Sequence, residues 1–108
     1  MFRVFTTKQF DEDFDKLDGS DKKKVRKIKK QLESEGGKVG KPLGREYFRE
    51  KKFRGKRLYF LVYKQYTIVL AVGISNKKMQ QSTINKIISE IKEYGKFVKE
   101  NFEKISEN

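Results

Sequence analysis

The spacing of hydrophobic and polar residues changes several times along the chain, and each change predicts a new element. Residues 2–5 alternate in the manner of a short strand. Two segments of helical spacing follow, the first capped by Thr6 or Thr7 and ending near Asp18, the second over about residues 21–35. Each segment has one apolar stripe, formed by Phe10, Phe14 and Leu17 in the first and by Val25, Ile28 and Leu32 in the second. Because only a short turn separates them, we expect an antiparallel helical hairpin.

Strand-like spacing returns in the middle of the chain. After a connecting loop over residues 38–44, strands are expected at residues 47–53, 57–64 and 67–75. The last two are apolar at both even and odd positions, which is typical of strands covered on both faces. The pattern therefore predicts a three-stranded antiparallel meander with the helical hairpin on one face.

The chain ends in a long amphipathic segment. A polar loop over residues 76–81 precedes a last helix, which we expect to be capped by Ser82 or Thr83. Its apolar stripe is longer than a domain of this size needs, and Gly95 is the expected point of a bend or interruption. The part beyond the glycine should either fold back or contact another chain through Phe97, Val98, Phe102 and Ile105.

The length and composition restrict the class of protein. With 108 residues the chain is expected to form a single α+β domain, residues 1–108, in which residues 95–108 are a C-terminal helical extension. It contains no histidine and no cysteine, so a Ser-His-Asp triad, a Cys-His dyad and a conventional zinc site are excluded. It also lacks a glycine-rich phosphate loop, an apolar run long enough to cross a membrane and a signal peptide. We expect a cytoplasmic protein without a metal, a small-molecule cofactor or a membrane partner.

The distribution of charge is uneven. The formal net charge is +12, and the segment from Lys22 to Arg57 contains 16 basic and 4 acidic residues, which accounts for the whole excess. Such a segment is either a solvated face or a site for a polyanion, meaning nucleic acid or an acidic protein. The first helix is acidic on its outward face, so part of the lysine run in the second helix could serve only to neutralise it.

The order of the elements and several short motifs resemble the RelE/ParE superfamily of bacterial and archaeal toxins. The similarity extends to about Tyr94 and is carried by Pro42-Leu43, Phe48-Arg49-Glu50, Gly55-Lys56-Arg57-Leu58-Tyr59, Val62-Tyr63 and Asn76-Lys77-Lys78. It implies a RelE-like toxin of a type II toxin–antitoxin system, which cuts mRNA on the ribosome and is silenced by a RelB-like antitoxin. In that reaction the 2′-hydroxyl attacks its own phosphodiester, and cations stabilise the extra negative charge.

The resemblance also assigns residues. Arg57 matches the family's arginine at the start of the central strand and is the first candidate for a phosphate contact. Arg49 and Lys51 resemble the catalytic basic pair on the preceding strand, with Lys52 as the rival to Lys51. Lys77 or Lys78 takes the place of the basic residue after the last strand. The basic residues expected to contact RNA without catalysing its cleavage are Lys52, Arg54, Lys56, Lys27, Lys30 and Arg45.

One part of the family's pattern is missing. Active RelE enzymes usually carry a tyrosine just after the basic loop, where this chain has Gln80-Gln81-Ser82, and Tyr94 is too far along the helix to replace it. The general acid and base are therefore unassigned unless Glu50 or a lysine with a lowered pKa acts. Two alternatives follow: a ParE-like inhibitor of DNA gyrase, and a degenerate module that binds RNA or antitoxin without catalysis. Tyr59 and Tyr63 are expected to pack in the core.

Overall fold

The computed structural model describes residues 1–107, with side chains as far as residue 104. The elements, in chain order, are β1 (Arg3–Thr6), α1 (Lys8–Asp15), α2 (Gly19–Glu35), a 3₁₀ turn (Gly36–Lys38), β2 (Lys41–Arg45), β3 (Phe48–Phe53), β4 (Lys56–Tyr63), β5 (Ile68–Asn76), α3 (Gln80–Ser89) and α4 (Ile91–Glu107). The α+β class is confirmed.

The strands form one five-stranded sheet in the order β1-β5-β4-β3-β2. Strands β2 to β5 are antiparallel neighbours, whereas β1 lies parallel to β5. The expected three-stranded meander is present, but the sheet gains an edge strand on each side. The expectation of a plain loop over residues 38–44 was wrong, because Lys41–Arg45 pairs with β3. Pro42 and the neighbouring glycines obscured this strand, and a proline is tolerated here because β2 is an edge strand.

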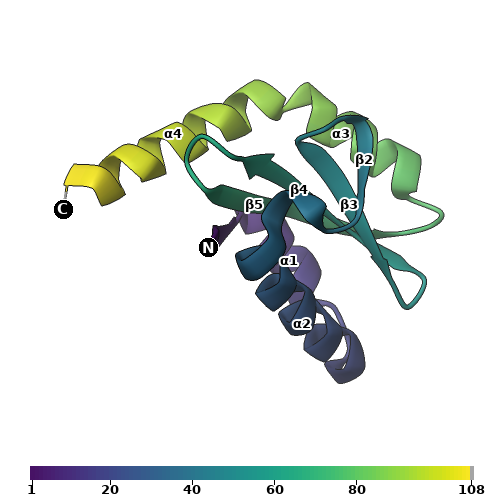
Figure 1. Cartoon of the computed structure of the whole chain (residues 1–108). Coiled ribbons are helices and arrows are strands. Elements are labelled where there is room, and N and C mark those ends of the chain that lie inside the picture. Colours follow the sequence, from purple (N-terminus) through teal and green to yellow (C-terminus); the bar gives the residue numbers. More distant parts are fainter. Residues whose placement is uncertain (108) are drawn as a thin grey trace.

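Helices cover both faces of the sheet, as Figure 1 shows, with α1 and α2 on one side and α3 and α4 on the other. The first face packs in a cluster that includes Val25, Ile28 and Leu32 of α2. The second face packs in a cluster that includes Ile87 of α3 and Val98 of α4. Strands β4 and β5 contribute alternate side chains to both clusters, which explains why most of each strand is apolar at both even and odd positions.

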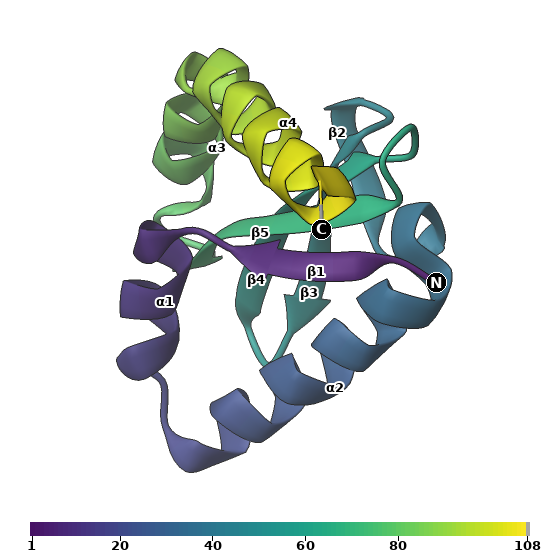
Figure 2. The same cartoon turned by 90° about the vertical axis from the view of Figure 1, so that its left-hand side faces the viewer.

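The two N-terminal helices begin at side-chain caps. The Thr7 hydroxyl accepts a hydrogen bond from the Phe10 amide at 3.1 Å, so the expected cap is confirmed. The Asp18 carboxylate accepts from the Asp21 amide at 2.8 Å, and α2 therefore starts at Gly19, earlier than the apolar spacing indicated. From the short connection the two helices spread apart along the sheet (Figure 2).

The C-terminal helical segment differs from the prediction at two points. The helix begins at Gln80 rather than after a cap on Ser82 or Thr83, because the Asn76 side chain accepts the Met79 amide at 2.9 Å and closes the preceding turn. The interruption falls at Glu90, between α3 and α4, whereas Gly95 lies inside α4. Glycine weakens a helix but does not end it when the surrounding turns pack well.

Helix α4 folds back over the second face of the sheet. Val98 is buried, and the Phe102 ring lies 4.6 Å from the ring of Tyr66, in the turn between β4 and β5. Phe97 remains 40% exposed. The side chain of Ile105, also expected to take part, lies outside the described residues. The segment beyond Gly95 was expected either to fold back or to contact another chain. Val98 and Phe102 fold back onto the sheet.

Candidate anion-binding site

Four candidate residues lie at the end of the sheet where β3 turns into β4. Lys52 is the cross-strand partner of Arg57, and Arg57 is in turn the partner of Ser75 on β5. Directly paired residues project from the same face, so these side chains form a row on the face covered by α3. Lys77 and Lys78 follow the end of β5 and are exposed at the same end of the sheet. The structure therefore brings together Lys52, Arg57, Lys77 and Lys78.

Arg49 and Lys51 lie on the opposite face. Their cross-strand partners are Phe60 and Leu58, which belong to the cluster beneath α1 and α2. Arg49 is buried, and its guanidinium donates to the carbonyls of Val39 at 2.9 Å and Gly40 at 3.1 Å. It thus anchors the chain before β2 instead of facing Arg57. Lys52 is the lysine of β3 that shares the face of Arg57.

Arg54 and Lys56 both form ion pairs with Asp21 within the protein. They flank Gly55 at the tip of the β3–β4 hairpin, where Arg54 and Gly55 have φ angles of 45° and 76°, as a type I′ turn requires. Arg54 Nε lies 2.7 Å and Lys56 Nζ 2.6 Å from the Asp21 carboxylate, which is 3% exposed. The hydrogen bond from Lys56, supported by Arg54 and opposed by burial, lowers the pKa of Asp21. This contact fastens the hairpin to the start of α2.

The remaining RNA-contact candidates are exposed and lie away from Arg57. Lys27 and Lys30 are on the outer surface of α2, on the other side of the sheet, and Arg45 ends the edge strand β2. The structure does not place them in the row formed by Lys52, Arg57 and Ser75.

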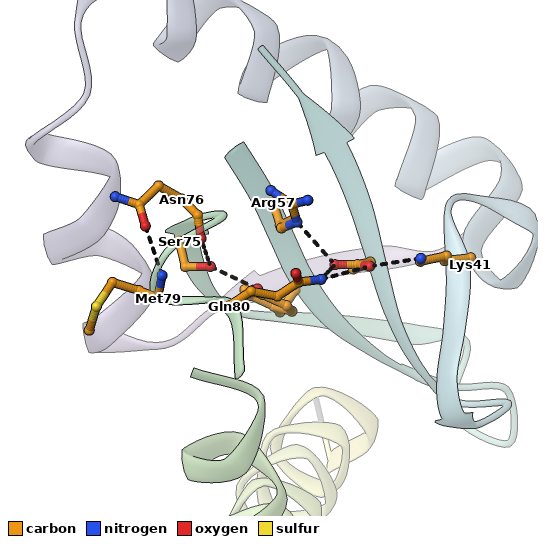
Figure 3. A network of polar contacts seen from close by, with 8 residues as sticks. Lys41, Arg57, Ser75, Asn76, Met79 and Gln80 are labelled. Carbon is orange, nitrogen blue, oxygen red and sulfur yellow. Dashed lines mark hydrogen bonds and ion pairs between the residues drawn. The ribbon is translucent and has the colours of Figure 1, made fainter. Parts of the chain in front are cut away.

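Glu50 stands at the centre of the site and connects four elements. Its side chain is fully buried, and Gln80 of α3 donates a hydrogen bond to it at 3.1 Å. Lys41 of β2 lies 3.4 Å and Arg57 of β4 3.8 Å from its carboxylate oxygens. Figure 3 shows these partners converging from different strands and from the start of α3. Sequence reasoning did not find Lys41 or Gln80, because the pairing of β2 with β3 and the start of α3 were not predicted.

One donor of Arg57 has no hydrogen-bond partner, although the residue is buried. The residue is 7% exposed, and among the described residues no group accepts a hydrogen bond from its Nε atom. The 3.8 Å to Glu50 is too long for a hydrogen bond and leaves only an electrostatic attraction. Buried guanidinium groups normally have their donors satisfied, because desolvation without partners is costly. Nε itself has almost no exposed surface, so an anion such as a phosphate would meet this side chain at the small part of it that remains exposed.

Three tyrosines have a pKa that is raised by burial, and none of them is an exposed group of the site. Tyr59 is buried, as expected, and its hydroxyl lies 2.7 Å from Ser75 Oγ. Burial raises the pKa of Tyr59, although the Ser75 bond opposes this. Burial also raises the pKa of Tyr63 to about 12 and, on α4, raises that of Tyr94. Gln80, in the segment where the resemblance led us to expect a tyrosine, is bound to Glu50.

The described residues contain no group of three or more acidic, histidine or cysteine side chains that could hold a metal ion. None of the described helices is long and apolar enough to cross a membrane.

The fold can be compared with known proteins at this point. No family model matches the sequence, and a search of curated proteins finds no match. Solved structures do match. The isolated RelE toxin of E. coli aligns with a TM-score of 0.63 and 14% identity, covering 81% of this chain and 99% of that one.

Two toxin–antitoxin complexes match equally well. The RelBE2 complex of Mycobacterium tuberculosis aligns with a TM-score of 0.62 and 24% identity over 70% of this chain and 98% of that chain. The RelB–RelE complex of Methanococcus jannaschii aligns with a TM-score of 0.61 and 13% identity, covering 74% of this chain and 98% of that chain. At these identities the match concerns the fold, and it confirms the resemblance at that level. The chain has the fold of the RelE toxins.

Proposed function

We propose that this protein is a RelE-like toxin, a cytoplasmic endoribonuclease that cuts mRNA on the ribosome by attack of the 2′-hydroxyl on the adjacent phosphodiester. One observation carries the proposal: on a RelE-type sheet, the buried guanidinium of Arg57 has an unsatisfied donor beside three exposed lysines. These are Lys52, Lys77 and Lys78.

The chemistry assigned to these residues is electrostatic. The 2′-oxygen forms a bond to phosphorus while the bond from phosphorus to the 5′-oxygen breaks, and the 5′-oxygen takes up a proton, which leaves a cyclic phosphate and a 5′-hydroxyl. The transition state carries extra negative charge on the phosphate oxygens, and preorganised cations stabilise that charge most when they are desolvated. Arg57 is desolvated and can offer a pair of donors to two phosphate oxygens. Lys52, Lys77 and Lys78 are exposed and hold neighbouring phosphates as point charges.

Glu50 supports this arrangement from within the protein. It is fully buried and is surrounded by Lys41, Gln80 and Arg57, so it does not reach a bound RNA. Glu50 is therefore not the general base in this proposal. Proton transfer is left to the RNA itself, to water or to groups supplied by the ribosome.

The proposed protein partner is a cognate RelB-like antitoxin. The similar structures from M. tuberculosis and M. jannaschii are complexes of toxin with antitoxin, and this chain covers 98% of each matched chain. A small acidic protein encoded next to this one, and copurifying with it, would support the pairing.

A non-catalytic role is the second candidate, either as a ParE-like inhibitor of gyrase or as a module that binds RNA or antitoxin. It is favoured by Gln80, which stands where active relatives carry a tyrosine and is bound to Glu50. The two candidates differ in whether messages are cut.

Induced expression followed by primer extension on a translated message separates them. The wild-type protein should give stops at A-site codons, and these should disappear when Lys52, Lys77 and Lys78 are all changed to alanine. The matched control changes three exposed lysines elsewhere, Lys64, Lys92 and Lys99, and should keep the stops. Intact messages accompanied by gyrase-linked DNA damage would contradict the nuclease.

A further inference from the structure

Helix α2 carries a second basic surface, separate from the Arg57 site. Val25, Ile28 and Leu32 point into the core and are buried. The opposite side carries Lys23, Lys27 and Lys30, with Lys24 and Lys29 nearer to its two margins, and we call these five exposed lysines the α2 lysine face. Lys23, Lys27 and Lys30 follow one another at intervals of four and three residues, so they form a row about 10 Å long.

These lysines are not neutralised by the rest of the protein. The sequence suggested that the acidic face of α1 could pair with them, but within the described side chains every ion pair involves other lysines and arginines. The Asp13 carboxylate accepts instead from Gln9 at 2.9 Å and from the Ile74 amide at 3.0 Å. Asp21, at the start of α2 itself, forms ion pairs with Arg54 and Lys56 of the β3–β4 hairpin. The charge of the face is therefore available to a partner.

The chemistry of the face indicates the class of partner. Protein–protein interfaces normally have a core of apolar and aromatic side chains, and the α2 lysine face has none. Sites for single-stranded nucleic acid normally provide aromatic rings on which bases stack, and these too are absent from it. The ring of Phe14 of α1 is covered by Lys22 and Arg26, whose charged groups lie 5.7 and 5.6 Å from its centre. What remains is a row of point charges, which suits a phosphate backbone.

The face is also directed away from the first site. It belongs to the helices that cover one side of the sheet, whereas Arg57 and Lys52 lie on the side covered by α3 (Figure 1). A single short strand of RNA held at Arg57 would not reach it without crossing the edge of the sheet.

We propose that the α2 lysine face is a second nucleic-acid site, which binds the backbone of double-stranded RNA without regard to sequence. The choice of RNA rests on the proposed function. The protein would thus hold a duplex with one side and present Arg57 to a single strand with the other.

Binding to a fluorescently labelled RNA duplex of mixed sequence, measured by anisotropy over a range of salt concentrations, tests the proposal without requiring any cleavage. Changing Lys23, Lys24, Lys27 and Lys30 together to glutamine removes four charges while keeping good helix formers. Binding should weaken at least about tenfold near 0.1 M salt, and the slope of log K against log salt should become shallower by about 3 to 4.

Two matched proteins complete the experiment. Changing Lys64, Lys86, Lys92 and Lys99 to glutamine removes the same charge from other exposed positions and should weaken duplex binding less than about threefold. The alanine variant of Lys52, Lys77 and Lys78 should keep its affinity for the duplex. This result does not depend on whether the wild-type protein cuts messages. A thermal melt confirms that each variant is folded.

Three results would overturn the proposal. The α2 variant could bind the duplex as the wild type does, or the control could lose as much affinity as the α2 variant. The α2 variant could also lose binding to a polyglutamate peptide while retaining the RNA duplex, which would make the partner an acidic protein.

Discussion

The basic residues of the sheet and those of α2 look alike in the sequence but are used differently. On β3 and the β3–β4 hairpin, Arg49, Arg54 and Lys56 are bound to backbone carbonyls or to Asp21. On α2, the lysines of the outward face have no such partners among the described side chains. A count of charges therefore overstates what the sheet can offer to RNA and understates what the helix can offer. Arg57 differs from both groups, because it is buried and still has a free donor.

The largest effect on stability is expected at Glu50. Replacing it with alanine leaves Arg57 largely buried without its carboxylate and removes the partner of Lys41 and Gln80. Loss of one member of a buried ion pair typically costs about 3–5 kcal/mol. Urea unfolding at neutral pH measures this, with Glu12→Ala on the exposed side of α1 as the control. A loss of less than about 1 kcal/mol would show that the network does not hold the site together.

The next largest loss of stability is expected at Arg49, which is a buried cation with a structural role. Its replacement by alanine removes hydrogen bonds to Val39 and Gly40 and frees the segment before β2, at an expected cost of about 2–4 kcal/mol. The same unfolding experiment on Lys51→Ala, which removes the same charge from the same strand face, should show a clearly smaller loss. Equal losses would mean that the hydrogen bonds of Arg49 contribute little.

Asp21 predicts how stability depends on pH. Because its pKa is lowered below the usual 3.8 in the folded state, its contribution is fully present above that value and is lost as the pH falls through the lowered pKa. Asp21→Asn should therefore be less stable than the wild type at neutral pH, and the difference should shrink in strong acid. Thermal melts at several pH values reveal it, with Asp15→Asn on the exposed side of α1 as the control. A difference that is constant with pH would contradict the ion pair.

The smallest effect on stability is expected on α2. Lys27→Ala and Lys30→Ala remove exposed charges from positions without ion pairs, so each should change the free energy of unfolding by no more than about 0.5 kcal/mol. If either variant is destabilised as strongly as Arg49→Ala, the contrast between the two basic regions fails.

Much of the fold could be read from the sequence because hydrophobic spacing reports burial directly. The two N-terminal helices, the doubly covered strands β4 and β5 and the class of fold follow from it. The edge strand β2 did not, because Pro42 and its flanking glycines are typical of a loop, and only pairing with β3 makes them a strand. The break at Glu90 was missed because it depends on how α3 and α4 meet the sheet, not on a helix-breaking residue.

The candidate site was predictable in part. Arg57, Lys77 and Lys78 were found through the motifs, and their position at one end of the sheet follows from the register. The choice between Lys51 and Lys52 could not be made, since a shift of one residue moves a side chain to the other face. Arg54 and Lys56 form ion pairs with Asp21, which is 33 and 35 positions away from them in the sequence. No local sequence pattern reports a contact over such a distance.

The central claim is that Arg57 binds the phosphate at which RNA is cut. Single-turnover cleavage of mRNA in the A site of purified ribosomes tests it most directly, with Arg57→Ala and Arg57→Lys compared with Lys64→Ala at a temperature where all are folded. The account predicts a loss of about 10²–10³ in rate for Arg57→Ala, partial recovery for Arg57→Lys and an unchanged rate for Lys64→Ala. Cleavage by Arg57→Ala at the wild-type rate, or no cleavage by the wild-type protein, would contradict it.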